Sequence, residues 1–168
     1  MTKSIGFPPI AKSDATVLIL GSMPGQKSLE EKQYYAHPRN SFWPIICKLF
    51  RSNENISYIE RKQLLYDNKI AVWDVLKQCY REGSLDSGID PTSIETNDFD
   101  TFLKKQPNIK HVFFNGAKAE QLFKKKVLKS LDEFNYLTYY KLPSTSPAHA
   151  AISKEQKIEE WKIIKSLT

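Results

Sequence analysis

Short apolar segments recur along the chain, and longer segments with a helical spacing of apolar positions lie between them. The short segments are rich in β-branched and aromatic residues, a composition typical of β-strands. The sequence therefore predicts four strands, over Thr16–Leu20, Ile70–Trp73, His111–Phe114 and Leu137–Leu142.

The longer segments carry apolar residues at the i, i+3, i+4 and i+7 spacing of an amphipathic helix. Ser153 and Gln156 fit a capping box, in which a hydroxyl and an amide cap the first turn of a helix. The predicted helices cover Phe42–Phe50, Tyr58–Asp67, Asp98–Lys105, Ala117 to about Ser130, and a last segment that buries Ile158, Trp161 and Ile164.

Strands that alternate with helices predict an α/β fold, with a mostly parallel sheet covered by helices on both faces. No internal repeat, low-complexity stretch or linker divides the chain. We therefore expect residues 1–168 to form a single three-layer α/β/α domain around a central four-stranded, mostly parallel sheet.

Glycine, proline and hydroxyl residues follow three of the predicted strands. GSMPG (residues 21–25) follows the first strand, Asn115-Gly116 follows the third, and LPSTSPAH (residues 142–149) follows the fourth. Ligands of open α/β sheets bind beyond the carboxyl ends of the strands, which meet at one edge. The sequence therefore predicts a functional site at that edge.

The formal net charge of +6 and a pI near 9.2 favour a polyanionic partner, because basic side chains displace the counterions of nucleic acid phosphates. The densest basic run is Lys124-Lys125-Lys126, in a predicted helix. It fits either a solvated helix face or a surface that contacts DNA.

The chain lacks any run of about 20 apolar residues, so we expect no membrane-spanning helix. The first residues lack the apolar core of a secretion signal, which indicates a cytoplasmic protein. Cys47 and Cys79 lie in apolar segments without metal-ligand spacing and fit buried, reduced thiols. We expect no metal and no cofactor.

Gly21, Pro24 and Gly25 make a tight turn that exposes its main chain to a ligand or simply joins two elements. The spacing of a nucleotide-hydrolase phosphate loop is absent. In LPSTSPAH, hydroxyls and main-chain N–H groups between two prolines suit DNA phosphates, although a stiff connection would look the same. Asn115 could hydrogen-bond the edge of an extruded base or form a turn with Gly116.

The segment QYYAHPRNSFW (residues 33–43) places two tyrosines before an amphipathic helix. Tyr34 or Tyr35 could stack on a base or pack under the loop. Asn40 fits the N-cap of the helix, or its carboxamide could orient a water molecule. His37 could simply hydrogen-bond the loop.

Taken in order, GSMPG, AHPRNSFW and PSTSPAH resemble the uracil-DNA glycosylase superfamily, most nearly its hypoxanthine-DNA (deoxyinosine) glycosylase family and next its mismatch-specific uracil-DNA glycosylases. The resemblance covers nearly the whole chain. Many members of the superfamily activate water with a polar residue at the position of Met23, which cannot do so. The resemblance instead assigns the water to Asn40, the only residue that we expect to be catalytic.

The resemblance implies a monofunctional DNA glycosylase that acts as a monomer on double-stranded DNA containing a deaminated base, preferably hypoxanthine. Uracil or xanthine as the base, and a non-catalytic nucleotide- or nucleic-acid-binding module, remain the alternatives. The residues expected at the base are Gly21, Ser22, Met23, Tyr35, Phe42 and Asn115, and those expected at the DNA are Gly25, Ser144, Thr145, Ser146, Pro147, Ala148 and His149.

Overall fold

The computed structural model describes residues 2–168 and contains the four predicted strands in one parallel sheet. Its strand order is β3-β2-β6-β7, and all three neighbouring pairs are parallel. The α/β fold with a central four-stranded parallel sheet is therefore confirmed. The strands span Val17–Gly21 (β2), Ile70–Asp74 (β3), His111–Asn115 (β6) and Thr138–Leu142 (β7).

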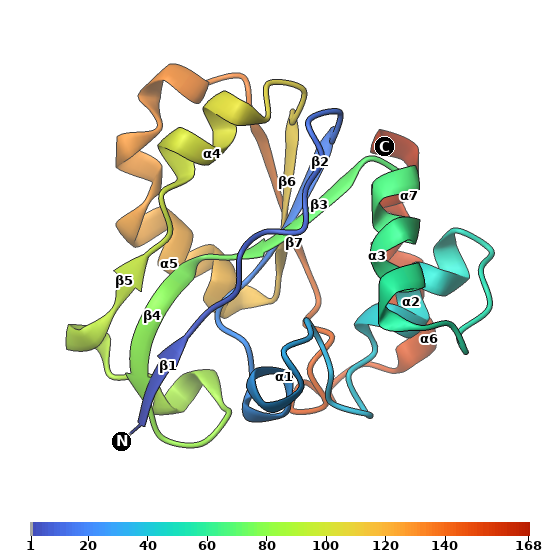
Figure 1. Cartoon of the computed structure of the whole chain (residues 1–168), viewed down its shortest axis with the longest axis horizontal. Helices are drawn as coiled ribbons and strands as arrows, with labels where there is room; N and C mark the ends of the chain where they lie inside the picture. The colour runs from blue at the N-terminus through green and yellow to red at the C-terminus, as the bar shows by residue number, and fades with distance from the viewer. Residues whose placement is uncertain (1) are drawn as a thin grey trace.

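Helices cover both faces of this sheet, as the alternating pattern predicts (Figure 1). Side chains of β2 alternate between two cores: Leu18 packs with the cluster on one face and Ile19 with the cluster on the other. One face carries α4 (Phe99–Lys105) and α5 (Ala117–Lys126), and the other carries α2 (Phe42–Leu49), α3 (Tyr58–Asp67), α6 (Lys154–Trp161) and α7 (Ile163–Leu167).

A second, antiparallel sheet of order β1-β4-β5 extends from the first, and the apolar pattern did not predict it. Its strands are Thr2–Ile5 (β1), Leu76–Arg81 (β4) and Glu95–Thr96 (β5). β1 and β5 are short and largely polar, so they lack the apolar run that marks a strand in a sequence. β4 begins two residues after β3 ends, and Val75 is the single residue between the two strands.

The helices differ from prediction mainly at their ends. A six-residue helix, α1 (Gln26–Glu31), was not predicted, because one and a half turns leave no clear periodicity. Lys162 divides the last helix into α6 and α7, and the Ser153 hydroxyl accepts the Gln156 N–H, the first half of the predicted capping box. Short 3-10 turns span Asp86–Gly88 (η1), Pro91–Ser93 (η2), Leu128–Ser130 (η3) and Asp132–Phe134 (η4), so that η3 replaces the end of the predicted fourth helix.

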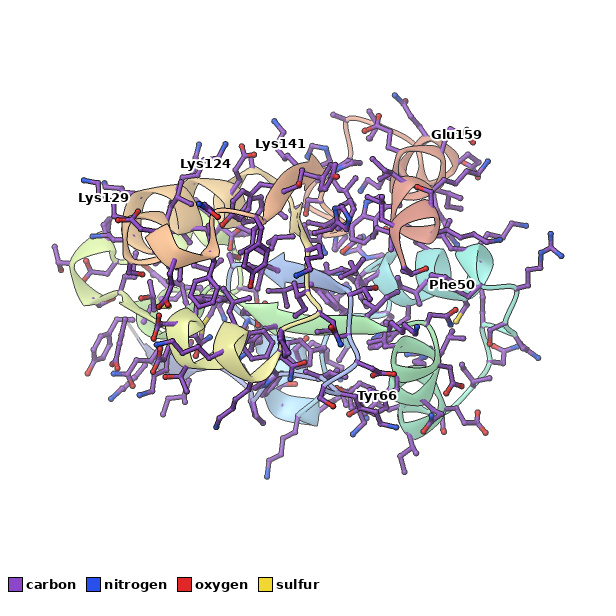
Figure 2. The ribbon with its side chains drawn as sticks, turned by 90° about the horizontal axis from the view of Figure 1, so that it is seen from above. Phe50, Tyr66, Lys124, Lys129, Lys141 and Glu159 are labelled. Atoms are coloured by element: carbon purple, nitrogen blue, oxygen red, sulfur yellow. The ribbon has the colours of Figure 1, made fainter. Side chains whose placement is uncertain are left out.

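The basic run lies on the exposed face of α5, where Lys124 pairs with Glu120 at 3.4 Å. Figure 2 shows Lys124 and Lys129 projecting outward from this part of the molecule. The exposed position of this run fits both alternatives, a solvated helix face and a surface that contacts DNA. Cys47 and Cys79 are buried and free, as expected. Within residues 2–168 no helix has the length and apolar character needed to cross a bilayer.

Candidate active site

The carboxyl ends of the four parallel strands lie at one edge because their register aligns them. Gly21 pairs with Asp74 across β2 and β3, and Asn115 pairs with Leu142 across β6 and β7. A cavity of about 820 Å³ opens at this edge. Its lining includes the predicted site residues Gly21, Ser22, Met23, Gly25, Tyr35, Asn40, Asn115, Ser144, Thr145, Ser146, Pro147, Ala148 and His149.

Gly21, the last residue of β2, lies on the floor of the cavity. A Cβ built on Gly21 would stand 2.5 Å from Asp74 Oδ1 and 3.0 Å from the Tyr35 hydroxyl. The missing side chain thus lets a carboxyl group and a phenol approach the main chain closely. At Gly21 the close approach to the main chain is thus made by two side chains of the protein, and the predicted approach of a ligand stays a prediction.

Tyr35 forms one wall of the cavity and has an uncommon backbone conformation, with φ at 55°. Non-glycine residues with positive φ are scarce and concentrate at functional sites. Its ring stacks on Phe42, with centroids 4.0 Å apart and planes at 24°. Its hydroxyl is buried and has no hydrogen-bond partner among the described residues, and burial, followed by the charge of Asp74, raises its pKa.

Phe42 lies behind Tyr35 and outside the cavity, with no exposed surface. The expectation that Phe42 touches the base does not fit this position. Phe42 instead packs against the Tyr35 ring and supports it. Stacked aromatic pairs stabilise each other beyond the area that they bury.

Tyr34 and His37 have the structural roles that the sequence allowed: Tyr34 packs under the loop, and His37 hydrogen-bonds within it. Tyr34 is 3% exposed, and its hydroxyl donates to the Pro8 carbonyl at 2.9 Å. His37 Nδ1 accepts the Arg39 N–H at 3.1 Å and so shapes the loop before α2. Tyr35 is therefore the tyrosine available for stacking.

Asn40 precedes α2 by two residues, and Ser41 occupies the N-cap position. The Asn40 side chain still serves the helix terminus, because its Oδ1 accepts the Phe42 N–H at 2.9 Å. This bond fixes the carboxamide at the cavity wall. A second lone pair on Oδ1 and both Nδ2 hydrogens are left for a bound molecule.

Asn115, at the end of β6, joins the sheet to the loop after β7. Its Nδ2 donates to Thr145 Oγ1 and its Oδ1 accepts the Thr145 N–H, both at 2.9 Å. The Thr145 carbonyl in turn accepts the Ser41 N–H at 3.0 Å. Asn115 thus has one amide hydrogen left for a base and acts mainly as a clamp on the loop.

Thr145 is 1% exposed, so the expectation that its hydroxyl holds a DNA phosphate does not fit. Its neighbours form the rim instead. Ser144 Oγ accepts the Ser146 N–H and Ser146 Oγ accepts the Ala148 N–H, two successive hydroxyl turns that stiffen the loop. Ala148 and His149 are exposed at its tip.

Asp74, the last residue of β3, was not predicted as a site residue although it lines the cavity. It is 3% exposed, and its Oδ2 has no hydrogen-bond partner among the described residues. Burial, followed by the charge of Asp86, raises its pKa from 3.8 to about 7, while Arg81 acts in the opposite direction. A buried carboxyl group without a partner is costly, which suggests that a ligand supplies one.

The loop between β4 and β5 is the other part of the site that the sequence did not reveal. The lining residues Ser84, Leu85, Asp86 and Ser87 share the cavity with the Ser144–His149 loop. The Ser22 hydroxyl donates to Asp86 Oδ1 at 2.6 Å and so connects this loop to the turn at residues 21–25. The signal was weak because these residues belong to the unpredicted second sheet.

This cavity combines an aromatic wall, a fixed carboxamide, a buried carboxyl group and a rim of hydroxyls and main-chain N–H groups. It is large enough for a purine, which aromatic stacking and edge hydrogen bonds could hold. Among residues 2–168 no group of three His, Cys, Asp or Glu side chains is placed to hold a metal ion.

Comparisons with known proteins point to one family. The model of the uracil DNA glycosylase superfamily matches residues 8–168. A hypoxanthine DNA glycosylase of Methanosarcina barkeri is 41% identical over 118 residues, 70% of this chain and 73% of the relative. One of Methanosarcina acetivorans is 34% identical over 160 residues, 95% and 96% of the two chains. A solution structure from M. acetivorans, described as a candidate uracil DNA glycosylase, superposes with a TM-score of 0.82 at 32% identity and covers 99% of both chains.

Proposed function

The chain belongs to the uracil DNA glycosylase superfamily, and from this premise we propose that it removes hypoxanthine from DNA by hydrolysing the N-glycosidic bond. Residues 1–168 act as one glycosylase domain, which takes the deaminated base out of duplex DNA and does not cut the strand. Two relatives described as hypoxanthine DNA glycosylases support this choice of base. The protein acts as a monomer in the cytoplasm, with DNA as its partner.

The observation that carries this proposal is the meeting of Tyr35, Asn40 and Asp74 around one cavity of about 820 Å³. These residues come from separate segments of the chain and supply three different groups that a base excision needs. The base swings out of the stack into the cavity, since its glycosidic bond is out of reach inside the duplex. Tyr35, supported by Phe42, then stacks on the base.

Asp74 recognises the edge of the base. Hypoxanthine carries a hydrogen on N1, whereas adenine has a lone pair there. An ionised Asp74 carboxyl accepts the N1–H of hypoxanthine and repels the N1 lone pair of adenine. This contact gives the buried Oδ2 the partner that it otherwise lacks.

Asn40 holds the water molecule whose oxygen takes the place of the base on the deoxyribose. The water oxygen bonds to C1′ of the deoxyribose, the C1′–N9 bond breaks, and the base departs with the bonding electrons and a proton. An amide does not titrate, so Asn40 orients the water through Oδ1 rather than removing its proton. Positioned dipoles of this kind stabilise the charges that develop as the bond breaks.

The rim holds the DNA around the extruded nucleotide. The flanking phosphates are held by main-chain N–H groups and hydroxyls of Ser144, Ser146 and the residues up to His149. Gly25, in the turn at residues 21–25, contacts the same DNA strand. Thr145 keeps this loop in place from beneath.

Cleavage of synthetic duplexes tests the proposal. Matched oligonucleotides carry inosine, uracil, xanthine or adenine at one position, and alkali after incubation breaks the strand wherever a base has been lost. We expect strand breaks chiefly at inosine and none without alkali. Binding of all four duplexes without any cleavage would contradict the proposal and indicate a non-catalytic nucleic-acid-binding module.

Uracil is the second candidate base, because the structural neighbour is described as a candidate uracil DNA glycosylase. Met23 argues against efficient uracil removal, since a thioether at this position cannot activate water. Faster cleavage at uracil than at inosine would make uracil the substrate and leave the fold and cavity assignments unchanged.

A further inference from the structure

Lys157 is a lysine buried beneath the loop that follows β7. It belongs to α6, and only 6% of its surface is exposed. Its ammonium group donates a hydrogen bond to the His149 carbonyl at 2.7 Å, a short distance that is typical of a charged donor. Four residues further along α6, the Trp161 indole N–H donates to the Pro143 carbonyl at 3.0 Å. One face of α6 therefore holds both ends of the Ser144–His149 loop.

Among residues 2–168, no carboxylate lies within ion-pair distance of Lys157. Glu159 of the same helix pairs with Lys162 at 2.6 Å on the outside of the molecule (Figure 2). Burial lowers the pKa of the Lys157 ammonium group. Lysine is rarely buried without a charged partner, because removing its charge from water is costly. An anion that binds near Lys157 would offset this cost.

The loop that Lys157 supports is the rim that we propose holds the DNA phosphates. Before His149 this loop carries only hydroxyl and apolar side chains. Lys27 and Lys118 also line the cavity, but they come from α1 and α5 and not from beneath this loop. The His149 N–H donates to the Ser146 carbonyl at 3.0 Å, so the carbonyl that Lys157 bonds lies close to a rim hydroxyl. At physiological salt, charges interact over about 8 Å, which includes a phosphate bound at this rim.

We propose that Lys157 supplies the positive charge behind the rim, which attracts the DNA phosphate that the loop holds and keeps the loop tip in place to receive it. This inference rests on the proposed function. Lys157 is a positioning residue, since it acts through the loop and lies outside the lining of the cavity. Phosphates carry no sequence information, so its contribution should be the same for damaged and undamaged duplexes.

The test measures Kd for an undamaged duplex over a range of salt concentrations, together with kcat and KM for an inosine duplex. Lys157→Met keeps an unbranched side chain of similar length and removes the charge. We expect it to raise Kd and KM roughly tenfold while kcat stays within about twofold. The slope of log Kd against log salt should become shallower by about 0.9, the value for one phosphate. Lys157→Arg keeps the charge and should restore most of the affinity and the slope.

Lys165→Met is the matched control, because it removes the same charge from an exposed lysine of α7 that lies outside the cavity. It should leave both Kd and the salt slope unchanged. Thermal unfolding checks that each variant is folded. If Lys157→Met does not fold, Lys157→Gln takes its place with the same expectation.

An unchanged salt slope with Lys157→Met, a fall in kcat alone, or an equal effect of Lys165→Met would overturn this assignment. It would also be overturned if Lys157→Arg failed to restore the affinity, since the lysine would then only shape the loop. The Kd measurement uses undamaged DNA and does not depend on cleavage. A wild-type protein that binds the duplex without cleaving inosine would therefore overturn the proposed function, while the salt slope would still decide the role of Lys157.

Discussion

Asn40 owes its orientation to the helix that follows it. Its Oδ1 already accepts the Phe42 N–H, so the carboxamide does not need to be ordered when a substrate arrives. Groups that are fixed in advance stabilise a developing charge without a cost of reorganisation. The same bond explains why the sequence suggested both a capping role and a catalytic role: the side chain can fill both.

Replacement of this carboxamide tests its role in the reaction. Asn40→Ala should lower the rate of inosine cleavage about a hundredfold, equivalent to about 3 kcal/mol, while DNA affinity remains. Single-turnover cleavage and a binding assay measure the two effects. Asn53→Ala is a matched control, because the Asn53 Oδ1 accepts the Asn55 N–H in the same way on an exposed loop. Unimpaired cleavage by the Asn40 variant would remove Asn40 from the mechanism.

Asp74 makes the stability of the protein depend on pH. Its pKa rises from 3.8 to about 7 on folding, because of burial and then the charge of Asp86, with Arg81 opposing and Tyr35 neutral beside it. Between these two values the folded state keeps a proton that the unfolded state loses. Stability should therefore fall as pH rises from about 4 to about 7, by up to about 4 kcal/mol.

The Asp74→Asn variant removes this titration. We expect it to melt at a similar temperature to the wild type near pH 4 and at a higher temperature at pH 8, as measured by thermal unfolding across pH. Asp90→Asn is the control, since hydrogen bonds from Thr92 lower the pKa of that exposed carboxyl group and no such gain should follow. A melting difference between wild type and Asp74→Asn that stays constant with pH would contradict this account.

At the scale of elements, the loop after β7 depends on the end of β6. Asn115 supplies two of the hydrogen bonds to Thr145 that hold this loop. Asn115→Ala leaves the buried Thr145 N–H and hydroxyl without partners, so we expect about 1–3 kcal/mol of lost stability and weaker binding to DNA. Thermal unfolding and a binding titration measure both. An unchanged melting temperature would show that the loop holds its position without the clamp.

The pattern of apolar residues predicted those elements that bury a continuous face. The four strands of the parallel sheet were found because they are rich in β-branched and aromatic residues, and α2 was found because its buried residues recur at a helical spacing. β1 and β5 pair through the main chain and carry polar side chains, so no pattern marks them. The break at Lys162 within the last helix likewise has no signal, since helical residues continue on both sides.

At the scale of the whole molecule, the site divides into a part that sequence motifs reveal and a part that only the fold assembles. Glycine, proline and asparagine after the strands pointed to Gly21 and Asn115, while the segment before α2 and the family resemblance pointed to Asn40. Asp74 ends an ordinary apolar strand, and its importance depends on its burial next to Gly21, which a sequence does not show. Leu85 reaches the cavity only because the second sheet carries its loop to the mouth.

Thr145, in the loop after β7, is the point at which three distant segments meet, since Ser41 and Asn115 both bond to it. A crossing of this kind links the helix that follows Asn40 to the rim that we propose holds the DNA phosphates, through one buried residue. Order in the helix that follows Asn40 therefore favours order in the rim, and the reverse also holds. A DNA strand bound at the rim would then also order the proposed water site at Asn40. Undamaged DNA, which engages the rim alone, would then leave the enzyme already primed for the next lesion along the strand.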